Sequence, residues 1–263
     1  MGFPDRFPGA NWAPIPGCPG LTWADTTDNR REVLHSTEGS SIAGAESAYR
    51  TNRSAPHLTV DAARRTIHNH VGMSKAAYSL RNGSEPTETN RDRYTWQVEI
   101  VGFAARMGGL PAGQLEWLAE NVLRPFADVY GVPYVALDFH PYPPPMRLGA
   151  EPWRMSSAEW LRFSGICGHQ HVGDGNFHGD PGALNVPHMV KIARGKTEQQ
   201  KGALMALTDE QQDELFRNAR DAKIFAARAY AYAKAGALWG LTEDEAKLVR
   251  KQAAQTDPTN NVK

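Results

Sequence analysis

The sequence predicts an α/β or α+β domain followed by an alanine-rich helical appendage. Three observations indicate this. Residues 94–102 alternate apolar and polar side chains, which is the period of a β-strand. Residues 111–130 place apolar side chains on one face of a helix. From residue 208 onward the chain is rich in alanine and charged residues at helical spacing.

Five short segments are predicted to contain strands: 31–38, 57–60, 62–69 (with a turn before the strand), 94–102 and 164–169. In the first, Val33 and Leu34 lead into His35 and further polar residues. In the fourth, Trp96, Val98 and Ile100 alternate with Thr95, Gln97 and Glu99. The fifth is a short apolar segment that runs directly into a group of histidines.

Two helices are predicted between these strands, over 41–50 and 111–130. The first follows from the helical spacing of Ile42, Ala45 and Tyr49. The second should be kinked or shortened by Pro125, which cannot donate a backbone hydrogen bond. Residues 81–93 and 141–153 are polar or proline-rich, and we expect loops there.

The composition divides the chain into three regions: a Pro/Gly-rich N-terminal arm over 1–30, a main domain over 31–196 and a helical region over 197–263. The arm is expected to lie extended over the domain surface. In the last region Thr208 and Gln211 form a capping box that opens a helix of roughly seven turns. Its heptad-like spacing favours packing on the domain or self-association with another copy.

The charge balance and the apolar pattern exclude several classes of protein. The 263 residues include 29 basic and 29 acidic side chains, which argues against a dedicated nucleic-acid binder. No apolar run is long enough to insert in a membrane, and the first residues lack the apolar core of a signal peptide. Cys18 and Cys167 are too few for a disulfide framework; one disulfide could join them, but two buried reduced thiols are favoured.

Histidine is the informative part of the composition, because four of the nine histidines fall within residues 169–188. A catalytic zinc site needs three protein ligands and one open position. His169 and Asp180 could supply two ligands, and His35 at the end of an early strand is the natural candidate for the third. A metal held there would polarise a carbonyl and lower the pKa of a bound water towards ~7.

Taken together, these motifs resemble one enzyme family. The chain contains Val33-Leu-His35, then His57 on a second strand, then Glu99 on a third, then Gly168-His169 and finally Asp180-Pro-Gly. This order and spacing resemble the zinc-dependent, type-2 N-acetylmuramoyl-L-alanine amidases, whose fold is shared with peptidoglycan-recognition proteins. Gly168-His-Gln-His-Val172 looks most like endolysins of actinobacterial phages. The resemblance covers residues 30–190 and implies a mixed central β-sheet flanked by helices, with one Zn²⁺ and a peptidoglycan (muropeptide) substrate.

The resemblance assigns roles to five residues. His35, His169 and Asp180 fall on the positions of the metal ligands. His178 falls where the family places a basic residue that stabilises the oxyanion, and Glu99 falls where some members place the general base. Many phage members have a Tyr before the histidine of the second strand, but this chain has Pro56 there. This departure favours Glu99 as the base.

Some assignments stay open at this point. His171 is a rival to His169, because side chains two residues apart on a strand face the same way. Tyr78 and Asn82 could line the substrate groove or be unrelated to it. The remaining histidines lack partners at a metal-binding spacing and are interpreted as structural or exposed: His57, His68, His70, His140 and His188.

The leading functional hypothesis is a zinc amidase that cuts peptidoglycan as a phage endolysin and causes host cell lysis. Such an enzyme would accumulate in the host cytoplasm and reach the wall after release through a holin. The alternatives are a non-catalytic peptidoglycan-binding module and a bacterial amidase that recycles wall fragments. The complete set of His35, His169 and Asp180 favours the enzyme over the binding module.

Overall fold

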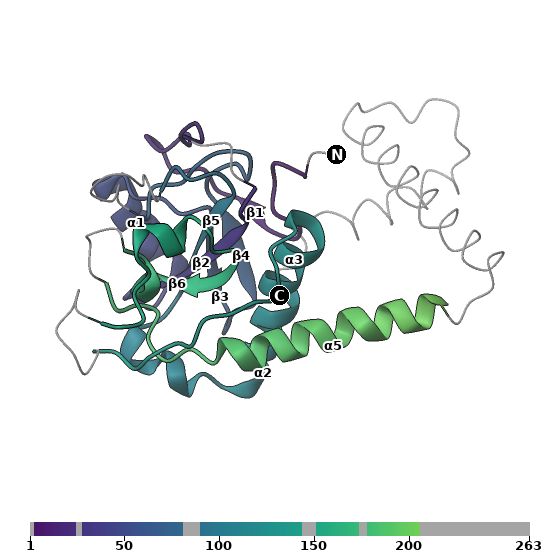
Figure 1. Ribbon diagram of the computed structural model, residues 1–263. Coiled ribbons are helices and arrows are strands. Elements are labelled where there is room, and N and C mark those ends of the chain that lie inside the picture. The colour runs from purple at the N-terminus through teal and green to yellow at the C-terminus, as the bar shows by residue number, and fades with distance from the viewer. Residues whose placement is uncertain (1–2, 25–27, 81–89, 144–150, 174–177, 206–263) are drawn as a thin grey trace, which may run out of the picture. The chain divides into compact units, whose positions relative to one another are not determined.

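The structure is a computed structural model that describes residues 3–24, 28–80, 90–143, 151–173 and 178–205 (Figure 1). The chain divides into two compact units, Met1–Thr197 and Glu198–Lys263. The strands are β1 (Asn11–Trp12), β2 (Arg31–Ser36), β3 (Leu58–Asp61), β4 (Thr66–Asn69), β5 (Thr95–Ile100) and β6 (Gly165–Gly168). The α-helices are α1 (Ile42–Asn52), α2 (Ala112–Leu118), α3 (Arg124–Tyr130), α4 (Ser157–Trp160) and α5 (Val186–Met205). The helical tail predicted from Thr208 lies outside the described residues.

A mixed six-stranded sheet forms the centre of the first unit, in the order β1-β4-β3-β5-β2-β6. Only the β3–β4 hairpin is antiparallel among these strands, and every other neighbouring pair is parallel. The five predicted strands are therefore confirmed, with ends that differ by a few residues. The mixed sheet with flanking helices confirms the predicted fold class.

The alternation predicted for β5 divides the sheet into an apolar and a polar face. Trp96, Val98 and Ile100 join the main apolar core, while Glu99 and its alternating neighbours face the other way. Because β5 lies between β3 and β2, even the polar side chains of Thr95 and Gln97 are buried. The sheet therefore has a dry face for packing and a polar face on which chemistry can be placed.

Helices α2 and α3 and the first turns of α5 cover the apolar face, where Leu118, Phe126 and Met189 pack in one core with Leu34 and Val98. Helix α1 contacts β3 on the polar side. The Tyr49 hydroxyl of α1 lies 3.1 Å from Thr59 Oγ1 of β3. Ser41 caps this helix by accepting from the Gly44 N–H, and the predicted buried positions, Ile42, Ala45 and Tyr49, are buried.

The N-terminal arm is more than the surface strap that its composition predicts. Phe7 is 2% exposed and stacks on Tyr130 within the main core. Asn11 and Trp12 form edge strand β1, which pairs with β4. The prediction missed this role because Pro and Gly dominate the segment and hide its isolated apolar anchors.

The predicted interruption near Pro125 takes the form of a π-helical segment, Ala119–Leu123, between α2 and α3. Proline lacks the N–H and crowds the carbonyl four residues earlier, so a wider turn just before it relieves the conflict. Leu118, Val122 and Phe126 remain buried through the change. The helical region therefore keeps one apolar face along its length.

Helix α5 was not predicted, although its burial pattern is regular. Val186, Met189, Val190 and Ala193 are buried at i, i+3, i+4 and i+7. Pro187 is tolerated because it lies in the first turn, where the backbone N–H has no helical partner. Among the described residues, no helix has the length and apolar character needed to cross a bilayer.

Both cysteines are buried and free, as expected, and they lie in different apolar clusters. Cys18 packs with Ile15 and Tyr49, whereas Cys167 packs with Val33 and Trp160. Burial raises the pKa of the Cys167 thiol to about 12. This thiol is therefore a small apolar core group.

His57 joins three segments of the polar face. Its Nε2 donates to the Lys75 carbonyl at 2.8 Å, and its Nδ1 accepts from the Gln97 N–H at 3.0 Å. Burial lowers the pKa of His57 to about 4. The folded protein therefore holds a neutral imidazole down to a pH at which an unfolded chain has already bound a proton.

This difference predicts a loss of stability as the pH falls from about 6.5 to 4. The pKa shift of His57 corresponds to on the order of 3 kcal/mol across that window. Urea unfolding of chelator-treated protein at pH 7.5 and 4.5 should show this loss. His57→Gln should lower stability at pH 7.5 and reduce the difference between the two pH values, while His188→Gln at an exposed site should keep it. A wild-type pH difference in His57→Gln would contradict this assignment.

Candidate metal centre

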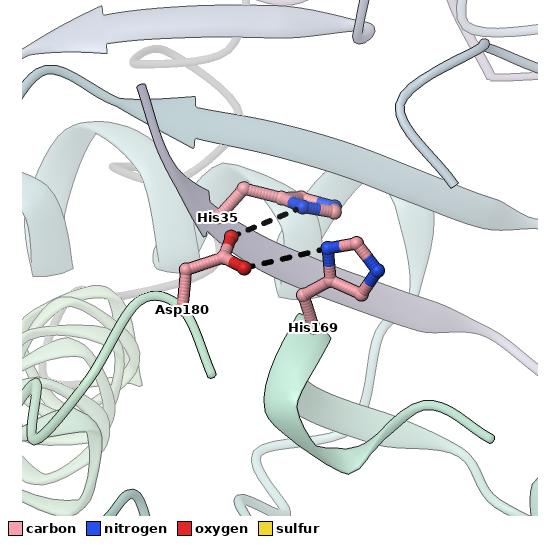
Figure 2. A group of neighbouring side chains, drawn as sticks. All are labelled: His35, His169 and Asp180. Carbon is pink, nitrogen blue, oxygen red and sulfur yellow. Dashed lines mark ion pairs between the residues drawn. The ribbon is translucent and has the colours of Figure 1, made fainter. Parts of the chain in front are cut away.

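The parallel strands gather polar side chains from distant segments at one edge of the sheet. His35 lies near the carboxyl end of β2 and pairs in register with Glu99 of β5. β6 runs parallel to β2 and ends at Gly168, so His169 follows at the same edge. Figure 2 shows His35, His169 and Asp180 converging from β2, from the turn after β6 and from the loop beyond it.

His35, His169 and Asp180 could together hold a metal ion. Candidate ligand atoms from all three lie within 4.8 Å of one another. The Nδ1 atoms of His35 and His169 lie 3.5 Å from Asp180 Oδ2 and Oδ1, respectively. Their side chains are only 2%, 3% and 10% exposed. Two imidazoles and one carboxylate form a donor set that suits zinc.

The Asp180 carboxylate shows why a cation fits this position. Its Oδ2 accepts from the Ser36 N–H at 3.3 Å, whereas no hydrogen bond within the described residues reaches its buried Oδ1. Burial alone would raise the pKa of Asp180, but the neighbouring His169, His178 and His35 hold the pKa well below its usual range. A negative charge is therefore kept at the centre of three imidazoles.

His171 does not point into the cluster, because the chain leaves the strand conformation after Gly168. Residues His169–His171 form a 3₁₀ turn instead of the strand that would have turned both histidines to one side. His171 Nδ1 accepts from the Gly168 N–H, and Nε2 donates to the Asp138 carbonyl, both at 2.9 Å. Burial lowers its pKa to about 4. Both ring nitrogens of His171 are thus used to hold the backbone.

His178 lies beside the cluster and is about half exposed to the cleft. Its ring stacks on His169 with centroids 4.5 Å apart and planes 10° apart. Its Nδ1 lies 3.4 Å from Asp180 Oδ1. The ring can therefore present a hydrogen-bond donor to a molecule next to the proposed metal position.

Glu99 reaches the same cleft from the neighbouring strand. Its Oε2 is buried, and no hydrogen bond from the described residues reaches it. Burial raises the pKa of Glu99 to about 7, while His35 and His178 act to lower it and Asp180 to raise it. A carboxyl group with a pKa near neutrality can both accept and return a proton.

These groups open into a cleft of about 1190 Å³. Its walls include Arg53 and Ser54 after α1, together with Tyr78, Asn90 and Tyr142. Tyr78, whose place in a groove the sequence left open, lines this cleft, whereas Asn82 lies outside the described residues. The sequence did not single out the other wall residues, because they belong to segments that meet only in the folded chain.

Glu38 and the other histidines lie outside the proposed ligand set. Glu38 Oε1 accepts from Ser36 Oγ and from the Ala104 N–H, both at 2.7 Å, so it links the end of β2 to the 3₁₀ helix that begins at Ala104. His70 bonds the Ala13 carbonyl and Thr59. The remaining histidines also lie away from the cluster: His68 pairs with Glu46, His140 stacks on Trp153, and His188 is exposed.

Comparison with known proteins gives distant structural likenesses only. No protein-family model and no curated protein matches the chain. A crystal structure of the Staphylococcus aureus hydrolase AmiA in complex with its ligand is similar at 14% identity and a TM-score of 0.49, over 75% of this chain and 87% of that chain. A structure of a mutant of PlyL is similar at 15% identity and a TM-score of 0.38, over 74% of this chain and 94% of that chain. Likenesses at this level assign neither a family nor an activity to the chain.

The cluster predicts one zinc ion per chain, measurable by isothermal titration of chelator-stripped protein. Asp180→Asn should weaken zinc binding by more than about 100-fold, because altering groups that only support a ligand already costs ~10–100-fold. His171→Gln is the matched comparison: because His171 only supports the turn, this change should lower the unfolding temperature and weaken zinc binding less than Asp180→Asn does. Retained affinity in Asp180→Asn, or a larger loss in His171→Gln, would show that the ligand set is wrong.

Proposed function

We propose that this chain is a zinc-dependent N-acetylmuramoyl-L-alanine amidase, which hydrolyses the amide between N-acetylmuramic acid and the L-alanine of peptidoglycan stem peptides. The observation that carries the proposal is the buried His35–His169–Asp180 cluster, which opens on a cleft beside Glu99. The order of the motifs along the chain, which resembles that of the type-2 amidases, supports the choice of substrate.

His35, His169 and Asp180 would hold the zinc ion. When bound, zinc would polarise the scissile carbonyl and acidify a water molecule. Glu99 accepts the proton of the attacking water, since its pKa near 7 allows an ionised carboxylate at neutral pH. The water oxygen forms the new bond to the lactyl carbonyl carbon.

His178 stabilises the developing negative charge on the carbonyl oxygen. Its half-exposed ring faces the cleft and, when protonated, can donate to that oxygen. Cleavage of the C–N bond leaves an amine on L-alanine, and Glu99 returns its proton to this nitrogen. The products are a lactyl carboxylate on the sugar and a free stem peptide.

The biological role that we propose is that of a phage endolysin, on the resemblance of Gly168–Val172 to endolysins of actinobacterial phages. A binding module would need the cleft but not Glu99 beside a complete ligand set. A wall-recycling amidase would carry out the same chemistry on soluble fragments. Comparing intact sacculi with soluble muropeptides as substrates distinguishes the endolysin from the wall-recycling amidase.

Mass spectrometry of the fragments released from purified peptidoglycan tests the proposed reaction. We expect stem peptides with a free N-terminal L-alanine, which disappear on chelation and return with zinc. Fragments that keep the lactyl amide would place the cut elsewhere. Binding to the wall without any release would indicate the non-catalytic module.

Glu99→Gln should retain zinc affinity and lower kcat by ~10²–10⁴-fold, the usual contribution of a general acid–base group. In the wild type, kcat/KM should rise with pH as Glu99, whose pKa is about 7, loses its proton, and should then level off, because the base acts when deprotonated. Steady-state hydrolysis of a soluble muropeptide between pH 5 and 9 measures both effects. Near-wild-type kcat in Glu99→Gln would remove Glu99 from the mechanism.

A further inference from the structure

An arginine behind the site bridges Val172 and His178, the described residues near either end of the segment 174–177. It belongs to the segment Glu151–Met155, which also contacts the His171 carbonyl. We propose that Arg154 is the positioning residue for His178 and sets where its ring stands relative to the metal cluster. The catalytic part of this inference rests on the proposed function, because it assumes the role of His178 in amide hydrolysis.

The Arg154 guanidinium bonds the backbone of both Val172 and His178. Nη1 donates to the Val172 carbonyl at 2.6 Å, and Nη2 donates to the His178 carbonyl at 3.0 Å. The two donors belong to one rigid plane, so they fix the separation of the two carbonyls. A lysine ammonium, as a single point on a flexible chain, cannot reproduce this bridge.

Arg154 is itself held in place. Its side chain is 7% exposed, and its Nε lies 3.5 Å from Oε2 of Glu151, whose side chain is 1% exposed. Next to it, the Met155 N–H donates to the His171 carbonyl at 2.8 Å. At Gly173 an added Cβ would lie 2.5 Å from the Met155 carbonyl oxygen, so the two segments touch without room for a side chain.

This contact explains why a glycine stands at position 173. The carbonyls of His171 and Val172 both accept hydrogen bonds from the segment that contains Arg154. The ring of His178 stacks on His169, so a shift of its backbone would move the ring along or away from a proposed metal ligand. Arg154 therefore acts on the site through backbone carbonyls and not through its charge in the cleft.

A double-mutant cycle tests this coupling in the zinc-loaded, full-length protein. Arg154→Ala and Arg154→Lys should each lower kcat by ~10–100-fold with a smaller change in KM, as expected when a catalytic group is misplaced. In a His178→Ala background, Arg154→Ala should have little further effect. Arg162→Ala, an exposed arginine nearby, should leave kcat unchanged. The proposal would be overturned if the losses in kcat of Arg154→Ala and His178→Ala multiply in the double variant. Full activity in Arg154→Lys would also overturn it.

A second readout does not depend on activity. Diethyl pyrocarbonate modifies accessible imidazoles, and mass spectrometry gives the rate at each histidine. In the wild type His178 should react more slowly than the exposed His188, because one face of its ring is stacked. Arg154→Ala should raise the rate at His178 but not at His188, and Arg162→Ala should raise neither. An unchanged rate of His178 modification in Arg154→Ala would overturn the positioning role. If the wild type does not hydrolyse peptidoglycan, the proposed function is wrong. The modification rate of His178 still tests the role of Arg154 in that case.

Discussion

The site depends on one buried carboxylate that three imidazoles surround. Asp180 stays ionised although burial opposes its charge, because His35, His169 and His178 all lie close to it. A buried charge without such partners would cost several kcal/mol. Imidazole N–H donors, or a cation that lies between the rings, can compensate for this charge. A bound metal ion would satisfy the carboxylate and both histidine ligands while leaving the imidazoles neutral.

The sheet makes this arrangement possible by separating two tasks between its faces. Its apolar face packs against α2, α3 and the first turns of α5 and provides the buried core. Its polar face carries Glu99, and the carboxyl ends of parallel strands bring His35 and His169 to one edge. Residues that are more than 130 positions apart in the sequence thus meet without any local motif to join them. The hydrogen bonds of His171 and Arg154 then fix the two turns that leave this edge.

Local patterns predicted the parts of this molecule that follow a regular period. The alternation in β5 identified its two faces, and the spacing around Tyr49 identified α1. Patterns failed where packing or hydrogen bonding decides the conformation: Phe7 buries an arm whose composition indicates a surface segment, and the 3₁₀ turn separates His169 from His171. The sequence grouped the histidines and Asp180 by motif order, but it could not reveal Arg154, whose partners are backbone carbonyls. The ligand and catalytic roles of the site residues remain predictions.

The central claim is that His35, His169 and Asp180 bind one zinc ion at the polar edge of the sheet. Anomalous diffraction from crystals of the zinc-loaded protein, measured on both sides of the zinc absorption edge, tests it most directly. The account predicts one strong peak at about 2.0–2.2 Å from a nitrogen of each histidine and an oxygen of Asp180. A peak bound by His171, a peak away from this edge of the sheet, or no peak at saturating zinc would contradict it.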